Sequence, residues 1–391
     1  MTQPTFRFKL SAVLAASLMS LAAQAAEPLK IGLVLPMSGP FAAYGKQMEH
    51  GARLYLDQVG GTIAGRKVEL LIKDDTGVAP EISKRVAQEL VVKDKVDILA
   101  GFGLTPSAFA VAPIATEAKK PMVVMNAATS AITTKSDYIV RVSHTLPMVT
   151  APIATWAAKN NIKKVYTLVA DYGPGQDAEA QFKKTFTAAG GEVVGEVRTP
   201  VKNPDFAPFL QKIKDAKPQA VFLFVPPGEQ TIAFTKGFVE RDMAKAGIRI
   251  IATGDLTGED VIDGVGDNAL GIVNSMQYSE VHNSPENKAY VAAYYKAYPK
   301  DRPDFMSIGG YDGLQLIAKA LEKTGGDANG DKFMAAAKGL SWTSPRGPVS
   351  IDPQTRDIVQ TIYIRKVEKV NGKLQNVEFE SIPNFKDPGK Q

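Results

Sequence analysis

The chain has 391 residues, of which 45% are hydrophobic and 22% charged, so it fits two folded domains better than a disordered chain. Its 46 basic and 41 acidic residues give a formal net charge of +5, and no Lys/Arg stripe interleaved with aromatic residues occurs, which argues against nucleic acid as the main partner. The absence of cysteine excludes disulfides, thiolate metal sites, a cysteine nucleophile and an N-terminal lipid-modified cysteine.

Residues 1–25 have the organisation of a secretory signal peptide. Arg7 and Lys9 precede an apolar run over 10–23, which ends in a small-x-small pattern at 23–25. The run is shorter than the roughly 20 apolar residues of a membrane-spanning helix, so cleavage is favoured over anchoring. We therefore expect a mature, exported and soluble chain from about residue 26.

From Leu29 onward, short β-branched runs alternate with longer segments of helical period. The first series predicts strands over 29–36, 68–73, 96–100 and 122–125 and helices over 46–59, 80–92 and 108–118. The second series, after Ser143, predicts helices over 147–159, 176–189, 205–216 and 229–241 and strands over 164–169, 192–198, 220–225 and 249–252. Because this alternation is typical of parallel sheets covered by helices, we expect an α/β protein with two lobes.

The remaining chain predicts helices over 285–298, 313–323 and 332–337 and an antiparallel hairpin of 358–369 with 375–379 around Asn371-Gly372. Residues 138–146, between the two series, are strand-like and contain no Gly/Ser/Pro run. The lobes are therefore expected to be joined by strand-like crossings rather than by a flexible linker. Ligands of open α/β sheets bind at the carboxyl ends of strands, so the loops that follow the strands are the candidate site.

Two glycine motifs do not meet the requirements for nucleotide binding. Residues 39–46 have one residue too many between the glycines of a phosphate-binding loop, and Gln47 stands where a Ser or Thr must bind magnesium. Residues 101–103 follow a strand, but Pro106 replaces the third glycine of a dinucleotide fingerprint. These glycines suit a turn or a binding loop better than a phosphate site.

The sequence contains no recognisable catalytic or metal-binding pattern. His50, His144 and His282 lie far apart and belong to no ligand-spaced cluster, which favours ordinary surface or core histidines. No Gly-x-Ser-x-Gly elbow is present. We therefore expect no catalytic residue, no metal site and no cofactor.

Hydroxyl groups gather in the strand-end loops of the first lobe. Thr105 and Ser107 follow the strand at 96–100, and Thr129 follows the strand at 122–125. Hydroxyls beside the backbone N–H groups of a helix N-terminus can hold a carboxylate without a full positive charge. Each residue alone would be interpreted as an N-cap, but three in facing loops indicate a binding site.

Two further candidates end strands of the second lobe. Tyr172 offers a broad apolar wall with a polar edge, and Asp255 could receive an ammonium or a hydroxyl from a ligand held at its other end. The alternative for Asp255 is a cap of the next helix.

Four segments, in chain order, carry a resemblance to a known family: 33–45 (LVLPMSGPFAAYG), 73–76 (KDDT), 126–129 (NAAT) and 170–175 (ADYGPG). Together they resemble periplasmic solute-binding proteins of the leucine/isoleucine/valine-binding type, which feed a membrane ABC importer. The resemblance covers nearly the whole mature chain. It implies a type I fold with three crossings between two lobes that close over the ligand, formed by 26–143 plus 276–348 and by 144–275 plus 349–391.

The resemblance also assigns roles to residues at matching positions. Thr129 and the hydroxyl of Thr105 or Ser107 would hold the ligand carboxylate, Tyr172 would cover the ligand, and Asp255 would bind an α-ammonium. The remaining residues of the implied site are Tyr44 with Phe305 or Met306, which would line the side-chain pocket, and Ala127 in the Asn-Ala-Ala-Thr segment.

Three features depart from the leucine-binding pattern. The first-lobe disulfide common in those proteins cannot form, Pro106 stands in a loop that tends to be rich in serine, and 226–228 (PPG) occupy a position where an aromatic ligand contact is often found. The loops are also similar to those of relatives that bind benzoate-like acids.

The leading hypothesis is therefore a monomeric periplasmic binding protein that delivers a small carboxylate-bearing solute, a branched-chain amino acid, to an ABC permease. The alternative is an aromatic acid such as a hydroxybenzoate, whose hydroxyl could satisfy Asp255. An enzyme is disfavoured because no nucleophile–base pair or metal cluster was found. A sensor is disfavoured because the chain ends at Gln391 with no DNA-binding or membrane-spanning segment after the last strand.

Overall fold

The computed structural model describes residues 27–390, and the predicted signal peptide lies outside this range. Residues 29–141 form a six-stranded sheet in the order β2-β3-β1-β4-β5-β6, in which all neighbours are parallel except the edge pair β2 and β3. Its strands are β1 (Leu29–Leu35), β2 (Thr62–Ile63), β3 (Arg66–Asp74), β4 (Ile98–Gly101), β5 (Met122–Val124) and β6 (Ile139–Arg141). The intervening helices are α1 (Ala42–Gln58), α2 (Pro80–Val92) and α3 (Thr105–Glu117).

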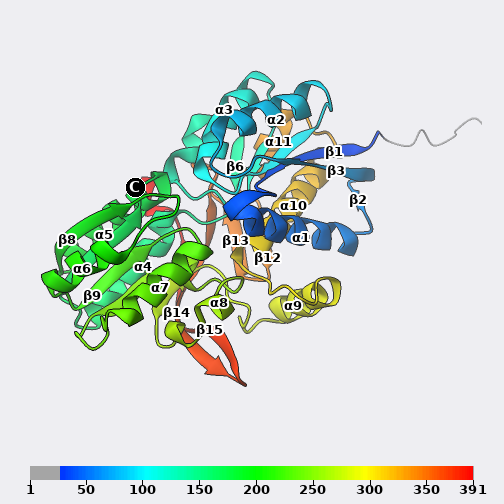
Figure 1. Ribbon diagram of the computed structural model, residues 1–391. Coiled ribbons are helices and arrows are strands. Elements are labelled where there is room, and N and C mark those ends of the chain that lie inside the picture. The colour runs from blue at the N-terminus through cyan, green and yellow to red at the C-terminus, as the bar shows by residue number, and fades with distance from the viewer. Residues whose placement is uncertain (1–26, 391) are drawn as a thin grey trace, which may run out of the picture.

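The second sheet has nine strands in the order β12-β13-β14-β11-β10-β9-β7-β8, with β15 paired to β14. Its strands are β7 (Lys164–Ala170), β8 (Glu192–Thr199), β9 (Ala220–Phe224), β10 (Arg249–Thr253), β11 (Val273–Met276), β12 (Ser341–Ser344), β13 (Gly347–Ile351), β14 (Ile358–Val370) and β15 (Lys373–Phe385). Its helices are α4 (Leu146–Lys159), α5 (Gly173–Ala188), α6 (Ala207–Ala216), α7 (Glu229–Glu240) and the short α8 (Ile262–Val265). The two sheets lie in different halves of the molecule, so the expected two-lobed α/β architecture is confirmed (Figure 1).

The chain passes between the halves three times. It leaves the first sheet after β6, and it returns after β11 into α9 (Pro285–Ala297) and α10 (Phe305–Thr324), of which α10 packs along α1 (Figure 1). After α11 (Gly330–Ala337) it enters the second sheet again through β12 and β13, which join β14. The predicted lobe boundaries place residues 341–348 with the first lobe, whereas their strands are hydrogen-bonded into the second sheet.

The largest boundary error of the sequence prediction concerns α10. The helix begins at Phe305, eight residues before the predicted start at residue 313, and it contains Gly309 and Gly310. Both glycines are needed for close packing, since a Cβ on Gly310 would lie 2.0 Å from the Met48 carbonyl oxygen of α1. The Asp304 carboxylate caps the helix by accepting hydrogen bonds from the N–H groups of Met306 and Ser307, both at 2.9 Å. Phe305 and Met306 consequently lie on the first turn of a helix.

Candidate functional site

A small cavity between the two halves brings together seven of the nine predicted site residues. They are Tyr44, Thr105, Ala127, Tyr172, Asp255, Phe305 and Met306. The other residues that line it are Gly103, Leu104, Asn126, Ala128, His144, Leu146, Pro174, Phe224 and Pro227. The cavity lies at the carboxyl ends of β4, β5, β7, β9 and β10, which is where parallel sheets place their ligands.

The remaining two predicted residues do not line the cavity. The Thr129 hydroxyl lies directly behind it and shares a 2.8 Å hydrogen bond with the Thr105 hydroxyl. Ser107 is fully buried, and its hydroxyl donates to Asp75 Oδ2 at 2.6 Å. Of the two alternative residues, only Thr105 therefore lines the cavity, while Ser107 stabilises the loop after β3.

Two helix N-termini converge on one side of this cavity. Thr105 is the first residue of α3 and Gly173 is the first residue of α5, and both helices have a proline in their first turn. A Cβ on Gly173 would lie 2.6 Å from Thr129 Oγ1, so the glycine permits the close approach of the two segments. The free N–H groups and the positive ends of both helix dipoles favour a bound anion such as a carboxylate.

Asp255 is the only carboxylate among the residues that line the cavity. It lies in the 3₁₀ turn η3 (Gly254–Thr257) after β10, and Thr253 Oγ1 donates to its Oδ2 at 2.7 Å. Burial raises the pKa of Asp255 to about 6, although Thr253 and Arg365 oppose the shift. Burial also raises the pKa of the Tyr44 and Tyr172 phenols, so both remain neutral and Asp255 is the principal acceptor.

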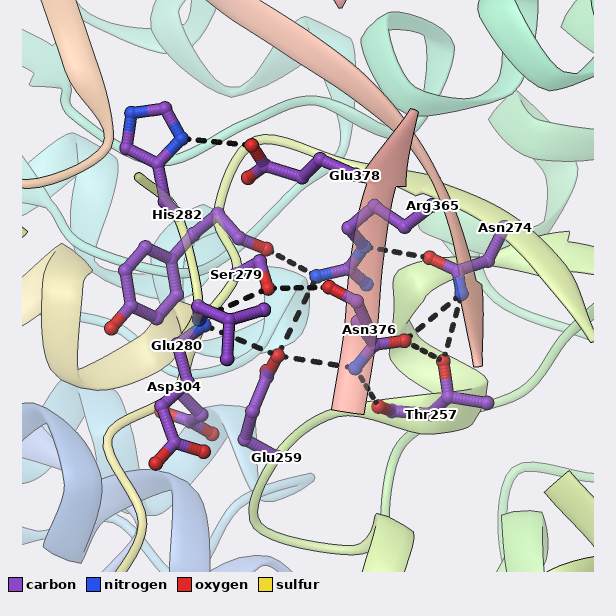
Figure 2. Close-up of polar contacts among 12 residues, drawn as sticks. Thr257, Glu259, Asn274, Ser279, Glu280, His282, Asp304, Arg365, Asn376 and Glu378 are labelled. Atoms are coloured by element: carbon purple, nitrogen blue, oxygen red, sulfur yellow. Dashed lines mark hydrogen bonds and ion pairs between the residues drawn. The ribbon is translucent and has the colours of Figure 1, made fainter. Parts of the chain in front are cut away.

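A buried polar network holds the η3 segment in place (Figure 2). Arg365 on β14 donates through Nε to Asn274 Oδ1 at 2.8 Å, and its Nη1 lies 3.8 Å from Glu259 Oε1. Asn376 on β15 donates to the Thr257 carbonyl oxygen at 2.7 Å and to Glu259 Oε1 at 3.1 Å. These contacts tie the loop that carries Asp255 to the β14–β15 hairpin.

Aromatic rings form much of the remaining wall. The ring of Tyr172 stacks on that of Phe224, with centroids 6.1 Å apart and planes at 17°. Phe305 meets the His144 ring edge to face, with centroids 5.7 Å apart and planes at 77°. Tyr44, buried on α1, completes this set. Between the helix N-termini and Asp255 the cavity is therefore suited to a flat apolar body.

Two residues of this wall, His144 and Phe224, are not among the site residues predicted from the sequence. His144 was interpreted as an ordinary histidine because it belongs to no local motif, yet it lies on the crossing after β6 and lines the cavity. Phe224 is the last residue of β9, so its position at a strand end was the available signal. Nothing in the sequence around His144 gives a comparable signal.

Direct contacts join the two halves around the cavity. The Tyr44 hydroxyl donates to the Pro227 carbonyl oxygen at 3.3 Å, and the Ser130 N–H donates to Asp177 Oδ2 at 2.7 Å. Tyr44 and Ser130 belong to the lobe of the six-stranded sheet, whereas Pro227 follows β9 and Asp177 lies on α5, both in the lobe of the nine-stranded sheet. The structure is therefore a closed arrangement of the lobes.

Two α/β lobes that close on a small cavity at their strand ends define the class of solute-binding proteins. Residues 28–373 match the family described as periplasmic binding protein, so the chain belongs to that family. It is the substrate-binding component of an ABC transporter, as the resemblance implied.

Three known proteins are similar to this chain over nearly its whole length. The chain is 45% identical to the Leu/Ile/Val-binding protein homolog 6 of Brucella melitensis, over 97% of this chain and 98% of that protein. It is 55% identical (TM-score 0.90) to an ABC-transporter solute-binding protein of Rhodopseudomonas palustris BisB5 in complex with 3,4-dihydroxybenzoic acid, over 93% of this chain and 99% of that one. A homologous protein of Rhodopseudomonas palustris HaA2 in complex with p-hydroxybenzoic acid is 46% identical (TM-score 0.91), over 93% and 100% of the two chains.

Within residues 27–390, no helix combines the length and the apolar character needed to cross a bilayer. Over the same residues, no group of three or more His, Asp or Glu side chains is arranged to hold a metal ion.

Proposed function

We propose that this protein captures a hydroxylated aromatic acid of the hydroxybenzoate class in the periplasm and delivers it to an ABC permease. The observation that carries the proposal is the aromatic wall of Tyr172, Phe224 and Phe305 between an anion-binding side and the carboxyl group of Asp255. A benzoate ring would be sandwiched by such rings, while its carboxylate would face Thr105 and the N-termini of α3 and α5. The ligands of the 55% and 46% identical solute-binding proteins have this chemistry.

The position of Asp255 favours a hydroxyl-bearing ligand over plain benzoate. Its carboxyl group is 6% exposed and accepts one side-chain hydrogen bond, from Thr253. A bare ring against this group would leave it desolvated without a further donor, which costs free energy. A ring hydroxyl supplies that donor, and its proton satisfies the carboxylate without a second buried charge.

A branched-chain amino acid is the second candidate, and it was the leading hypothesis from the sequence. Asp255 is the observation that favours it, because a buried carboxylate can pair with an α-ammonium. In an amino acid, however, ammonium and carboxylate share one carbon, so the aromatic walls would surround only an aliphatic side chain. A hydroxybenzoate would instead contact both the Asp255 carboxyl group, through its hydroxyl, and the aromatic rings of the wall, through its own ring.

A thermal-shift and calorimetry panel tests the choice. We expect 4-hydroxybenzoate and 3,4-dihydroxybenzoate to stabilise the wild-type protein, and leucine, isoleucine and valine to have little effect. A ligand at 100 times its Kd adds about 2.7 kcal/mol to the free energy of unfolding, which such an assay detects readily. Stabilisation by the amino acids alone would contradict the proposal.

The variant Asp255→Asn provides an independent discrimination. If the ligand is a hydroxybenzoate, Asn still accepts from the hydroxyl, so affinity falls modestly and benzoate binding is retained or improved. If the ligand is an amino acid, loss of a buried charge pair costs about 2 to 5 kcal/mol, which is about 30-fold or more in Kd. Unchanged binding of every compound would remove Asp255 from the site.

A further inference from the structure

The His144 side chain is a buried polar group whose partner is missing from the protein. It is 1% exposed, and neither Nδ1 nor Nε2 has a hydrogen-bond partner among residues 27–390. Of the residues that line the cavity, it is the only one with fully buried side-chain nitrogen or oxygen atoms left unpaired. Because such atoms are costly to bury, an orphaned imidazole at a ligand cavity indicates a contact that the ligand completes.

The surroundings of His144 determine what kind of contact this is. The charged neighbours that influence it, Arg141 and Arg346, are cations and cannot accept a hydrogen bond from the ring. Both are committed elsewhere: Arg141 is paired with Asp357 at 2.6 Å, and Arg346 is paired with Asp312 at 2.8 Å. Burial, aided by these two cations, lowers the pKa of His144 to about 3, so the ring is neutral.

A neutral imidazole offers one N–H donor and one nitrogen acceptor. A carboxylate can bond only the N–H, whereas a hydroxyl group can accept from the N–H or donate to the other nitrogen, so it can bond either nitrogen of the ring. Asp255 and His144 come from different elements, the turn after β10 and the crossing after β6, and both are among the residues that line the cavity. Two ring hydroxyls could thus be recognised by two separate groups.

We propose that His144 is a specificity-determining residue that hydrogen-bonds a second ring hydroxyl, so that the site prefers a dihydroxybenzoate over a monohydroxybenzoate. This inference rests on the proposed function, because it assumes that an aromatic acid occupies the cavity and that Asp255 receives its first hydroxyl. It assigns the substrate class more narrowly, to aromatic acids with a second ring hydroxyl group.

The test compares Kd values for benzoate, 4-hydroxybenzoate and 3,4-dihydroxybenzoate in the wild type, His144→Asn and His144→Leu. We expect His144→Leu to lose about tenfold in affinity for 3,4-dihydroxybenzoate while its Kd for 4-hydroxybenzoate changes little, since one hydrogen bond is removed. His144→Asn keeps a donor and an acceptor and should lose less affinity. The matched control is His50→Asn, because His50 stacks on Tyr298 at a centroid distance of 3.6 Å and does not line the cavity.

A second measurement keeps the test valid if a variant folds poorly. The chain has three histidines, so side-chain ¹H–¹⁵N spectra of the intact wild-type protein resolve them individually. Addition of 3,4-dihydroxybenzoate should shift the His144 resonances, assigned with the His144→Asn variant or by elimination from His50→Asn and His282→Asn, well beyond those of the other two. An unshifted His144 in the saturated complex overturns the inference.

The outcomes separate this inference from the proposed function. If the wild type binds 4-hydroxybenzoate and the variants weaken all three acids equally, or none, the assignment of His144 to a second hydroxyl is wrong while the proposed function stands. If the wild type binds no aromatic acid, the proposed function fails, and this inference fails with it.

Discussion

The threonine pair at the start of α3 shows how much a side chain's direction matters. Thr105 faces the cavity, whereas Thr129 is hydrogen-bonded to it from behind at 2.8 Å. We expect Thr105→Val to weaken the binding of every carboxylate ligand by about 1.5 to 3 kcal/mol, because a hydrogen bond to a charged group is lost. Thr129→Val removes a hydrogen bond between two neutral groups, so it should weaken ligand binding by only about 0.5 to 1.5 kcal/mol. Calorimetry in which Thr129→Val has the larger effect would reverse the assignment.

Three acids behind the site, of which Glu259 and Asp304 are buried and Asp260 is half-buried, have oxygen atoms without a partner among residues 27–390. They are Glu259 Oε2, Asp260 Oδ1 and Asp304 Oδ2. Burial raises the pKa of all three, and mutual repulsion with the neighbouring carboxylates adds to the shift. The nearby cations are Arg365, 3.8 Å from Glu259, and Arg302, which is paired with Glu280 at 2.7 Å. Negative charge is therefore in excess here.

This excess of negative charge predicts that Asp260→Asn stabilises the folded protein by an amount that depends on pH. An acid whose folded-state pKa is raised destabilises the protein above that pKa, and the penalty disappears as the pH falls toward the unfolded-state value of about 3.9. The variant should thus raise Tm by about 2 °C or more near pH 8, corresponding to about 1 kcal/mol, and by less near pH 5. Asp137→Asn is the control, since the Asp137 side chain is 94% exposed. Equal Tm changes at both pH values would contradict the argument.

The close contact between α1 and α10 sets the position of the helix that carries Phe305 and Met306. Besides Gly310 on α10, Gly51 on α1 is required, because a Cβ there would lie 1.8 Å from the Ser307 carbonyl oxygen. The sequence signals at this place conflict: Gly-Gly suggests a break, whereas the tertiary contact requires glycine inside a helix. Packing decides, and the cap at Asp304 fixes the first turn.

We expect Gly310→Ala to be clearly destabilising although alanine has the higher helix propensity. The added methyl would meet backbone atoms of α1 that cannot move independently, and overpacking of this kind costs about 1 to 3 kcal/mol. Thermal unfolding measures it, with Glu322→Ala on the exposed side of the same helix as the control. A Gly310→Ala protein as stable as the wild type would show that the two helices can separate at no cost.

At the level of the whole molecule, ligand binding and lobe closure should be linked. The hydrogen bond from Tyr44 to Pro227 and that from Ser130 to Asp177 can form only when the lobes are together. We expect the radius of gyration from small-angle scattering to decrease when a saturating ligand is added, because a buried solute must enter an open cleft.

The variant Tyr44→Phe isolates one closure contact. It keeps the aromatic wall and removes the hydroxyl that donates to the Pro227 carbonyl oxygen at 3.3 Å. Affinity for all ligands should fall together, by about 0.5 to 1.5 kcal/mol, because the closed state is stabilised less. If the radius of gyration of the wild type and of Tyr44→Phe stays unchanged when ligand binding is confirmed, the two lobes do not close over the ligand.

The sequence by itself determined the features that depend on local patterns. Hydrophobic periodicity predicted α2 at its observed bounds, 80–92, and the hairpin of β14 with β15 around Asn371-Gly372. The alternation of strands and helices gave two α/β series, and the rule that ligands bind at strand ends led to loops that do border one cavity.

The tertiary structure alone decided which side chains of those loops meet. Thr105 and Ser107 are indistinguishable in the sequence, but packing turns one hydroxyl to the cavity and the other to Asp75. His144 has no local signature, because its position depends on how the crossing after β6 passes between the lobes. β11, β12 and β13 were missed because they are only four or five residues long, too short for a clear alternation of apolar and polar residues. Periodicity is a property of neighbours in the chain, whereas a binding site is formed by contacts between residues far apart in it.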